Sequence, residues 1–174
     1  GGARMQAYGL AAGVGRVFRI HGAQPSYASI VGAGANACVL HYRDNSAKSR
    51  DGELVLIDAG AEYRGYAADI TRTFPVNGRF SKEQRALHDL VCAAQATALA
   101  QSRPGVAYEA GHDAAVATLT EGLLSLGLLK GRLETAIERG DYKRFYRHKT
   151  GHWLGLDVHD VGEYRIDGES RLLE

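Results

Sequence analysis

Apolar residues between positions 54 and 74 are spaced in a way that predicts two strands joined by a tight turn. Residues 54–60 form an apolar run that is broken only by Asp58, whereas residues 65–74 alternate and are rich in threonine, isoleucine and tyrosine. Two such runs on either side of Arg64-Gly65 predict a β-hairpin, because a glycine suits a two-residue turn.

Elsewhere, the spacing of apolar residues predicts helices and two shorter strands. A capping box at residues 81–84 precedes a helix that should bury Leu87 and Val91, and a second helix is expected over residues 108–126. Residues 8–20 predict a helix despite three glycines, residues 29–31 and 38–42 predict short strands, and residues 128–146 have no clear pattern. Because strands precede the main helices rather than alternating with them, this order favours an α+β fold.

Asp58 interrupts a run that is typical of a buried strand, and an unpaired carboxylate is costly to bury. If the turn is Arg64-Gly65, Tyr66 pairs with the residue before the turn and Asp58 lies opposite Thr71. Residues two apart on a strand share a face, so Asp58 and Asp69 become diagonal neighbours that can reach a common point. Their like charges would repel there, and a metal cation would remove that repulsion. The alternative is that one carboxylate faces solvent and the other caps a turn.

Three histidines, His148, His152 and His159, lie close together near the end of the sequence. Neutral imidazole is the commonest metal ligand, although a single histidine is more often an ordinary core or surface residue. The zinc-peptidase helix signature requires a glutamate directly after its first histidine, and Lys149 stands there instead. Carboxylates together with imidazole suit manganese, magnesium, zinc, cobalt or iron. A site for two metals would need further carboxylates.

Composition narrows the class of protein but does not identify it. The 174 residues are 45% hydrophobic and 24% charged, with a formal net charge of +1. This balance is typical of a globular protein and gives no electrostatic reason to expect a nucleic-acid partner. No apolar stretch is long enough to predict a membrane span. We interpret the two cysteines, Cys38 and Cys92, as buried apolar residues and expect a cytoplasmic location.

Three segments of the sequence carry a recognisable combination of motifs: Val55-Leu-Ile-Asp-Ala-Gly60, Asp69-Ile-Thr-Arg-Thr-Phe-Pro75 and Gly151-His-Trp-Leu-Gly-Leu-Asp-Val-His-Asp160. Together, and in this order, they resemble the Xaa-Pro aminopeptidase (aminopeptidase P) group of the pita-bread metallopeptidases. The resemblance covers residues 25–174 and implies the α+β pita-bread fold. We therefore expect residues 1–174 to form one partial catalytic domain of that kind.

The resemblance also implies a role for each matching residue. Asp58 resembles the bidentate ligand of one metal, Asp69 the carboxylate that contacts both metals, and His152 the histidine ligand of the other metal. His41 and His159 resemble the pair that lines the substrate site and handles protons or hydrogen bonds. One further histidine, His148, resembles a residue beside the metal ligands.

By the same resemblance, the cofactors are two divalent metal ions, manganese first, with cobalt and zinc as alternatives. A hydroxide held by both metals would attack the peptide bond before proline and release the N-terminal residue. The implied partner is a peptide with proline at the second position, and the parent protein is expected to be a homo-oligomer.

The sequence also departs from the family pattern. The family has two glutamate ligands after the segment that resembles Leu172-Leu173-Glu174, and one of them serves as the general base. The separate N-terminal domain and the last strands of the family are missing as well. We therefore expect the 174-residue chain alone to be inactive.

Other functions remain open at this stage. An Xaa-Pro dipeptidase (prolidase) on the same scaffold is the nearest alternative, and a non-catalytic pita-bread module that binds peptides or proteins is an alternative of a different class. Methionine aminopeptidase fits less well around Asp69. Creatinase-like enzymes lack metal ligands, which argues against them here.

Overall fold

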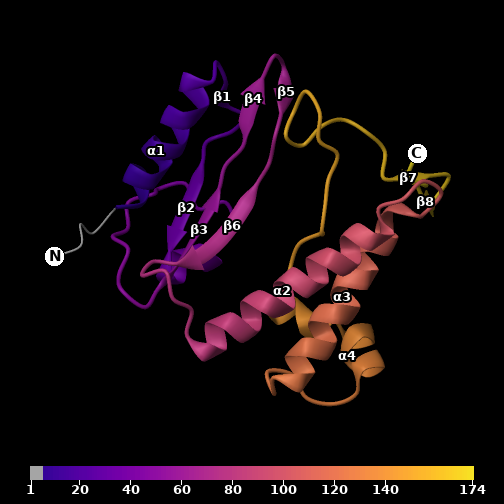
Figure 1. Cartoon of the computed structure of the whole chain (residues 1–174). Coiled ribbons are helices and arrows are strands. Elements are labelled where there is room, and N and C mark those ends of the chain that lie inside the picture. Colours follow the sequence, from indigo (N-terminus) through magenta and orange to yellow (C-terminus); the bar gives the residue numbers. More distant parts are fainter. Residues whose placement is uncertain (1–5) are drawn as a thin grey trace. The chain divides into compact units, whose positions relative to one another are not determined.

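The computed structural model describes residues 6–174 and divides them into two compact units (Figure 1). The first unit comprises residues 6–81 together with residues 153–161, and the second comprises residues 82–152 together with residues 162–174. Each unit contains its own elements and is described separately. Among the described residues, no helix is both long enough and apolar enough to cross a membrane.

The first unit consists of one helix and two small antiparallel sheets. One sheet has the strand order β2-β3-β6 and the other has the order β1-β4-β5. A short 3₁₀ helix, η1, follows β2. The bounds are α1 Ala7–Ile20, β1 Gln24–Pro25, β2 Ile30–Ala33, η1 Gly34–Cys38, β3 Leu54–Asp58, β4 Ala61–Tyr63, β5 Tyr66–Ala67 and β6 Thr71–Pro75.

The core of the first unit forms where α1 packs on the sheet that contains β2 and β3. Ala7 at the start of α1 and Val31 on β2 are fully buried, and Val55 on β3 is almost fully buried. Partly buried apolar side chains from α1, β3 and the segment after β6 pack around them. This packing compensates for the glycines in α1, since each costs a helix about 1 kcal/mol relative to alanine.

The turn between β4 and β5 is the one that the sequence predicts. Tyr63 pairs with Tyr66, and Arg64 and Gly65 have φ angles of 52° and 88°. Positive φ at both central residues is the requirement of a type I′ turn, which matches the twist of the flanking strands. Asp58 also pairs with Thr71 across β3 and β6, so the predicted register is confirmed.

The second unit is a helical hairpin with a short β-hairpin at its C-terminal end. Its core is formed mainly by Ala94, Ala98, Ala115 and Leu119, where the first two helices pack together. The alanines at three of these positions allow the helices to approach closely. The bounds are α2 Lys82–Gln101, α3 Tyr108–Ser125, α4 Leu133–Arg139, η2 Asp141–Arg144, β7 Arg165–Ile166 and β8 Glu169–Ser170.

Several expectations about these elements were wrong. Residues 38–42 are not a strand, because η1 continues to Cys38 and a turn follows. Leu87 and Val91 are exposed, at 41% and 58% of their surface. Residues 128–146 contain α4 and η2, where no element was expected. Both cysteines are exposed rather than buried.

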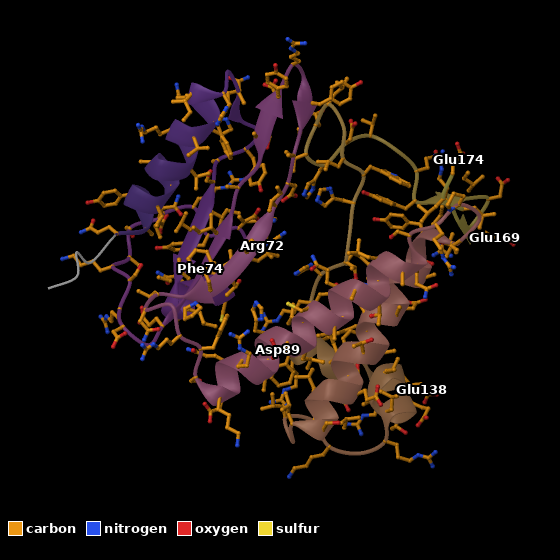
Figure 2. All side chains as sticks on the ribbon, viewed as in Figure 1. Arg72, Phe74, Asp89, Glu138, Glu169 and Glu174 are labelled. Carbon is orange, nitrogen blue, oxygen red and sulfur yellow. The ribbon has the colours of Figure 1, made fainter. Side chains whose placement is uncertain are left out.

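Strand β6 is an edge strand of the sheet β2-β3-β6. Within residues 6–174, it pairs with β3 on one side only. Arg72 and Phe74 stand two residues apart on β6, and both side chains are exposed (Figure 2). Residues two apart on a strand share a face, so β6 presents one charged and one aromatic side chain on the same side.

Candidate metal centre

Gly60 lets the two carboxylate-bearing segments of the first unit approach closely. A Cβ atom added at Gly60 would lie 1.6 Å from the carbonyl oxygen of Ala68, so no side chain fits there. Ser26 then connects the two segments. Its backbone N–H donates to Gly60 O at 3.0 Å, and its hydroxyl donates to Ala68 O at 2.8 Å. The residue after Ser26 is thereby fixed beside both segments.

That residue is Tyr27, and its hydroxyl contacts both predicted metal-binding carboxylates. The hydroxyl donates a hydrogen bond to Asp58 Oδ1, and it lies 3.0 Å from Asp69 Oδ1. Asp58 is the last residue of β3, whereas Asp69 lies in the irregular stretch between β5 and β6. The two side chains therefore converge on one point, as the shared-face argument predicts.

Burial and the two carboxylates keep Tyr27 protonated. Loss of water around the half-buried side chain is the main reason that the Tyr27 pKa is raised far above 10.0. The hydrogen bond to Asp58 and the negative charges of Asp58 and Asp69 raise the pKa further. A phenolate at this position would be a third negative oxygen, so the neutral hydroxyl is the stable form.

The chemistry of this cluster fits a divalent cation. A phenol carries one proton and donates to one carboxylate at a time. The carboxylates of Asp58 and Asp69 therefore compete for the proton of Tyr27, and their like charges repel. A hard cation such as Mn²⁺ prefers carboxylate oxygens and would neutralise both groups. Asp58 and Asp69 are thus suitable as part of a metal site.

His152 and His148 lie in the second unit, in an irregular segment after η2. The Nδ1 atom of His148 lies 2.8 Å from the carbonyl oxygen of Lys149. The imidazole packs edge-on against Tyr146, with ring centroids 5.2 Å apart. His152 is half-buried, and the carbonyl oxygen of the preceding Gly151 accepts a hydrogen bond of 2.6 Å from Tyr108. Both histidines are therefore carried by a backbone segment with fixed contacts.

His41 and His159 both lie in loops of the first unit and are exposed. His41 follows η1 and has a φ of 56°, a left-handed conformation that is uncommon for residues other than glycine. His159 belongs to a loop that is attached to β5, where Ala67 N donates to Gly155 O at 2.8 Å. Asp160 closes this loop by accepting a hydrogen bond from Leu156 N at 3.1 Å.

The structure thus brings together only part of the predicted ligand set. Asp58 and Asp69 converge at Tyr27. Within residues 6–174, no group of three histidine, cysteine, aspartate or glutamate side chains is already arranged to hold a metal ion. The sequence pattern gave no indication of Tyr27. No local motif marks it, and only the need of two adjacent carboxylates for a hydrogen-bond donor could have pointed to such a residue.

Comparison with known proteins assigns the family. Residues 3–174 match the model of metallopeptidase family M24. The chain belongs to this family. Over 150 residues, this M24 chain is 53% identical to the Xaa-Pro aminopeptidase of Haemophilus influenzae. The matched region covers 86% of this chain and 35% of that protein. It is 49% identical over 168 residues to the Xaa-Pro aminopeptidase of Escherichia coli, covering 96% of the chain and 38% of that protein.

Solved structures confirm the fold class. The aminopeptidase PepP of Pseudomonas aeruginosa matches 98% of the M24 chain and 39% of its own chain, with 53% identity and a TM-score of 0.96. The fold is therefore the α+β pita-bread fold of the aminopeptidase P group, as the motifs predicted. The M24 chain spans less than two fifths of the length of these relatives.

Structures of the Escherichia coli aminopeptidase P match the M24 chain with a TM-score of about 0.94 and 48% identity, again over 98% of this chain and 39% of that one. They include variants in which one aspartate, one histidine or one glutamate is replaced by alanine, and the glutamate variant is in complex with substrate. Another is zinc-substituted and in complex with product. Divalent metal ions are therefore part of the chemistry of this group.

Proposed function

We propose that this chain supplies the larger part of the two-metal site of an Xaa-Pro aminopeptidase. The observation that carries the proposal is the convergence of Asp58 and Asp69 on the single hydroxyl of Tyr27. Two carboxylates that converge on one point repel each other, and a divalent cation between them would remove that repulsion.

The spacing of site residues in a relative supports the individual assignments. In the Escherichia coli enzyme, the alanine variants replace three histidines and two aspartates. The intervals between these five positions equal the intervals between five residues of the M24 chain. The five residues are His41, Asp58, Asp69, His148 and His159.

We assign the metal ligands accordingly. Asp58 would hold one metal, Asp69 would contact both and His152 would hold the second, with manganese as the first choice and cobalt or zinc as alternatives. When bound, the metals would supply a water nucleophile that is activated near neutral pH. Tyr27 fixes the rotamers of Asp58 and Asp69, so that the oxygens are preorganised for this charge.

The remaining histidines act on the substrate and on the surroundings of the site. His41 and His159 are exposed imidazoles on loops of the first unit, and we assign them to hydrogen bonding or proton transfer at the peptide. His148 is held by Lys149 O and Tyr146, and we assign it a supporting position next to the ligand segment. The substrate is a peptide with proline at its second position.

Two glutamate ligands of the family have no counterpart among these 174 residues. The interval from the second substituted aspartate to the substituted glutamate of the Escherichia coli enzyme is longer than the stretch that follows Asp69 here. We therefore propose that the 174-residue polypeptide by itself does not hydrolyse peptides. Full activity is expected from a protein that also contains the glutamates.

The test is product analysis with the tripeptide Ala-Pro-Ala. The full-length protein that contains this sequence should release free alanine and Pro-Ala when manganese is present, and EDTA should abolish the reaction. The 174-residue polypeptide serves as the matched comparison and should leave the peptide intact. Cleavage of the dipeptide Ala-Pro with no cleavage of the tripeptide would instead identify a prolidase. Binding without any hydrolysis by the full-length protein would favour a non-catalytic module.

A further inference from the structure

The first residue of α3 connects two other segments of the second unit. The backbone N–H of Tyr108 donates to Arg171 O at 2.7 Å, and its phenol donates to Gly151 O at 2.6 Å. Gly151 directly precedes His152, and Arg171 lies three residues before Glu174. Tyr108 therefore joins the segment with the proposed histidine ligand to the segment at the end of the chain.

A second contact lies one helical turn further along α3. The Nδ1 atom of His112 lies 2.9 Å from the hydroxyl of Thr150, and the hydroxyl of Tyr146 lies 2.6 Å from the same atom. Residues four apart on a helix share one face. Tyr108 and His112 therefore hold two consecutive residues, Gly151 and Thr150, from one face of α3. We call this pair of contacts the α3 clamp.

Both clamp side chains are themselves held in place. The ring of Tyr108 packs on Tyr164, with centroids 4.8 Å apart, and the ring of His112 lies 5.8 Å from that of Tyr146. One position after Tyr108, the carboxylate of Glu109 accepts two hydrogen bonds, at 2.9 and 3.1 Å, from a single Nη atom of Arg165. A preorganised donor on a fixed ring loses little freedom when it binds a carbonyl oxygen.

The two contacts suit the positioning of a ligand rather than general packing. The hydrogen bonds go to the carbonyl oxygen of Gly151 and to the hydroxyl of Thr150, which belong to the two residues directly before His152. The segment itself has no helix or strand that could fix its backbone. Partners outside the ligand shell orient metal ligands, and their loss typically lowers metal affinity by about 10–100-fold.

We propose that the α3 clamp positions His152 for metal binding, so that Tyr108 and Thr150 are positioning residues of the site. This inference rests on the proposed function, because it presumes that His152 is a ligand. It adds a route by which α3, which contains no proposed ligand, controls the affinity of the site. Tyr108 links that route to the segment from Arg171 to Glu174.

The test uses the full-length protein and four variants. Tyr108→Phe removes only the phenol oxygen and keeps the ring on Tyr164. Thr150→Val removes the hydroxyl with little change in shape, whereas Thr150→Ser retains it. Tyr8→Phe is the matched control, because Tyr8 lies on α1 of the first unit and is 58% exposed. Thermal melting shows which variants remain folded.

Two measurements distinguish the effect of the α3 clamp on the backbone from its effect on metal binding. In metal-free protein, hydrogen exchange of residues 147–153 should be faster in Tyr108→Phe and Thr150→Val, but unchanged in Thr150→Ser and Tyr8→Phe. Calorimetry should show manganese binding about tenfold weaker in the first two variants, at the lower end of the effect expected for outer partners of a ligand. Rescue by serine would show that the segment requires the hydroxyl and not the volume of the threonine side chain.

Each other outcome is decisive. Unchanged exchange in Tyr108→Phe and Thr150→Val would overturn the clamp, whatever the metal affinity. Faster exchange with unchanged manganese affinity would overturn the positioning role. Wild-type protein that binds no divalent metal would overturn the proposed function and with it the role assigned to the clamp, while the exchange data would still report whether the clamp exists.

Discussion

Tyr27 holds Asp58 and Asp69 at one point, and the like charges that meet there are the reason at the residue scale to expect a cation. Like charges this close repel each other, and the repulsion is stronger away from bulk water. A metal ion between Asp58 and Asp69 would remove it, and Tyr27 would then serve to hold the ligands in position.

The sequence alone predicted the meeting of Asp58 and Asp69 but not the presence of Tyr27. The two-residue period of a strand and the turn at Gly65 determine which face each aspartate occupies. Tyr27 is separated from Asp58 by 31 positions and from Asp69 by 42. No local pattern relates residues that far apart, so such a contact depends on tertiary structure.

His112 should make the protein sensitive to acid. Burial is the main reason that the His112 pKa is lowered below 6.5, and Lys149 and His148 lower it further, while Asp113 and Glu109 oppose them. A histidine whose pKa is lower in the folded state than in the unfolded state resists protonation while the protein is folded. Its contribution to stability is fully present above the pKa of the unfolded state and is lost as the pH falls through the pKa of the folded state. Stability should therefore decline as the pH falls below about 6.5.

The variant His112→Gln checks this expectation, because glutamine does not titrate. Chemical denaturation at a series of pH values should show a smaller loss of unfolding free energy between pH 7 and pH 5 in the variant than in the wild type. Parallel curves for the two proteins would contradict the assignment of that acid sensitivity to His112.

At the scale of elements, the close approach at Gly60 decides whether the carboxylates can meet. Gly60→Ala places a Cβ atom 1.6 Å from the carbonyl oxygen of Ala68, so the segments after β3 and β5 must separate. Overpacking of this kind typically costs about 1–3 kcal/mol. We expect the unfolding free energy to fall by at least that amount in urea denaturation. Ala59→Gly, at the adjacent position, provides a comparison that introduces no clash.

The wrong expectations about elements have identifiable physical causes. Residues 38–42 have an apolar composition that suits a strand, but η1 occupies the preceding residues and His41 adopts a positive φ. Helix α4 is only seven residues long and has four charged or polar side chains, so it lacks the periodic signal of a longer helix. Gly140 ends this helix in a left-handed conformation. A glycine indicates the end of a helix only where the helix before it has already been recognised.

The burial of α2 could be predicted only in part. The capping box and the spacing of apolar residues correctly predicted a helix after residue 81, which spans Lys82–Gln101, and Ala94 and Ala98 on it are buried. Leu87 and Val91 were expected on the same buried face, yet they are exposed. Periodicity identifies an apolar face, but it does not say which part of that face a neighbouring helix covers.

At the scale of the whole molecule, the 174 residues carry three of the five ligands that we propose. They match relatives that are more than twice as long. Asp58 and Asp69 lie in the first unit, and His152 lies in the second. Catalysis by a two-metal site requires every ligand to be present, because each metal must be held in a fixed geometry. The account therefore predicts activity for the full-length protein and none for this stretch alone.

The most direct test of the central claim is the manganese content of the full-length protein after equilibrium dialysis. The account predicts about two manganese ions per chain for the wild type. It also predicts a loss of most of that metal in Asp69→Asn, which keeps the shape of the side chain but removes the charge shared by both sites. Wild-type protein that retains no manganese, or an Asp69→Asn variant that retains as much as the wild type, would contradict the account.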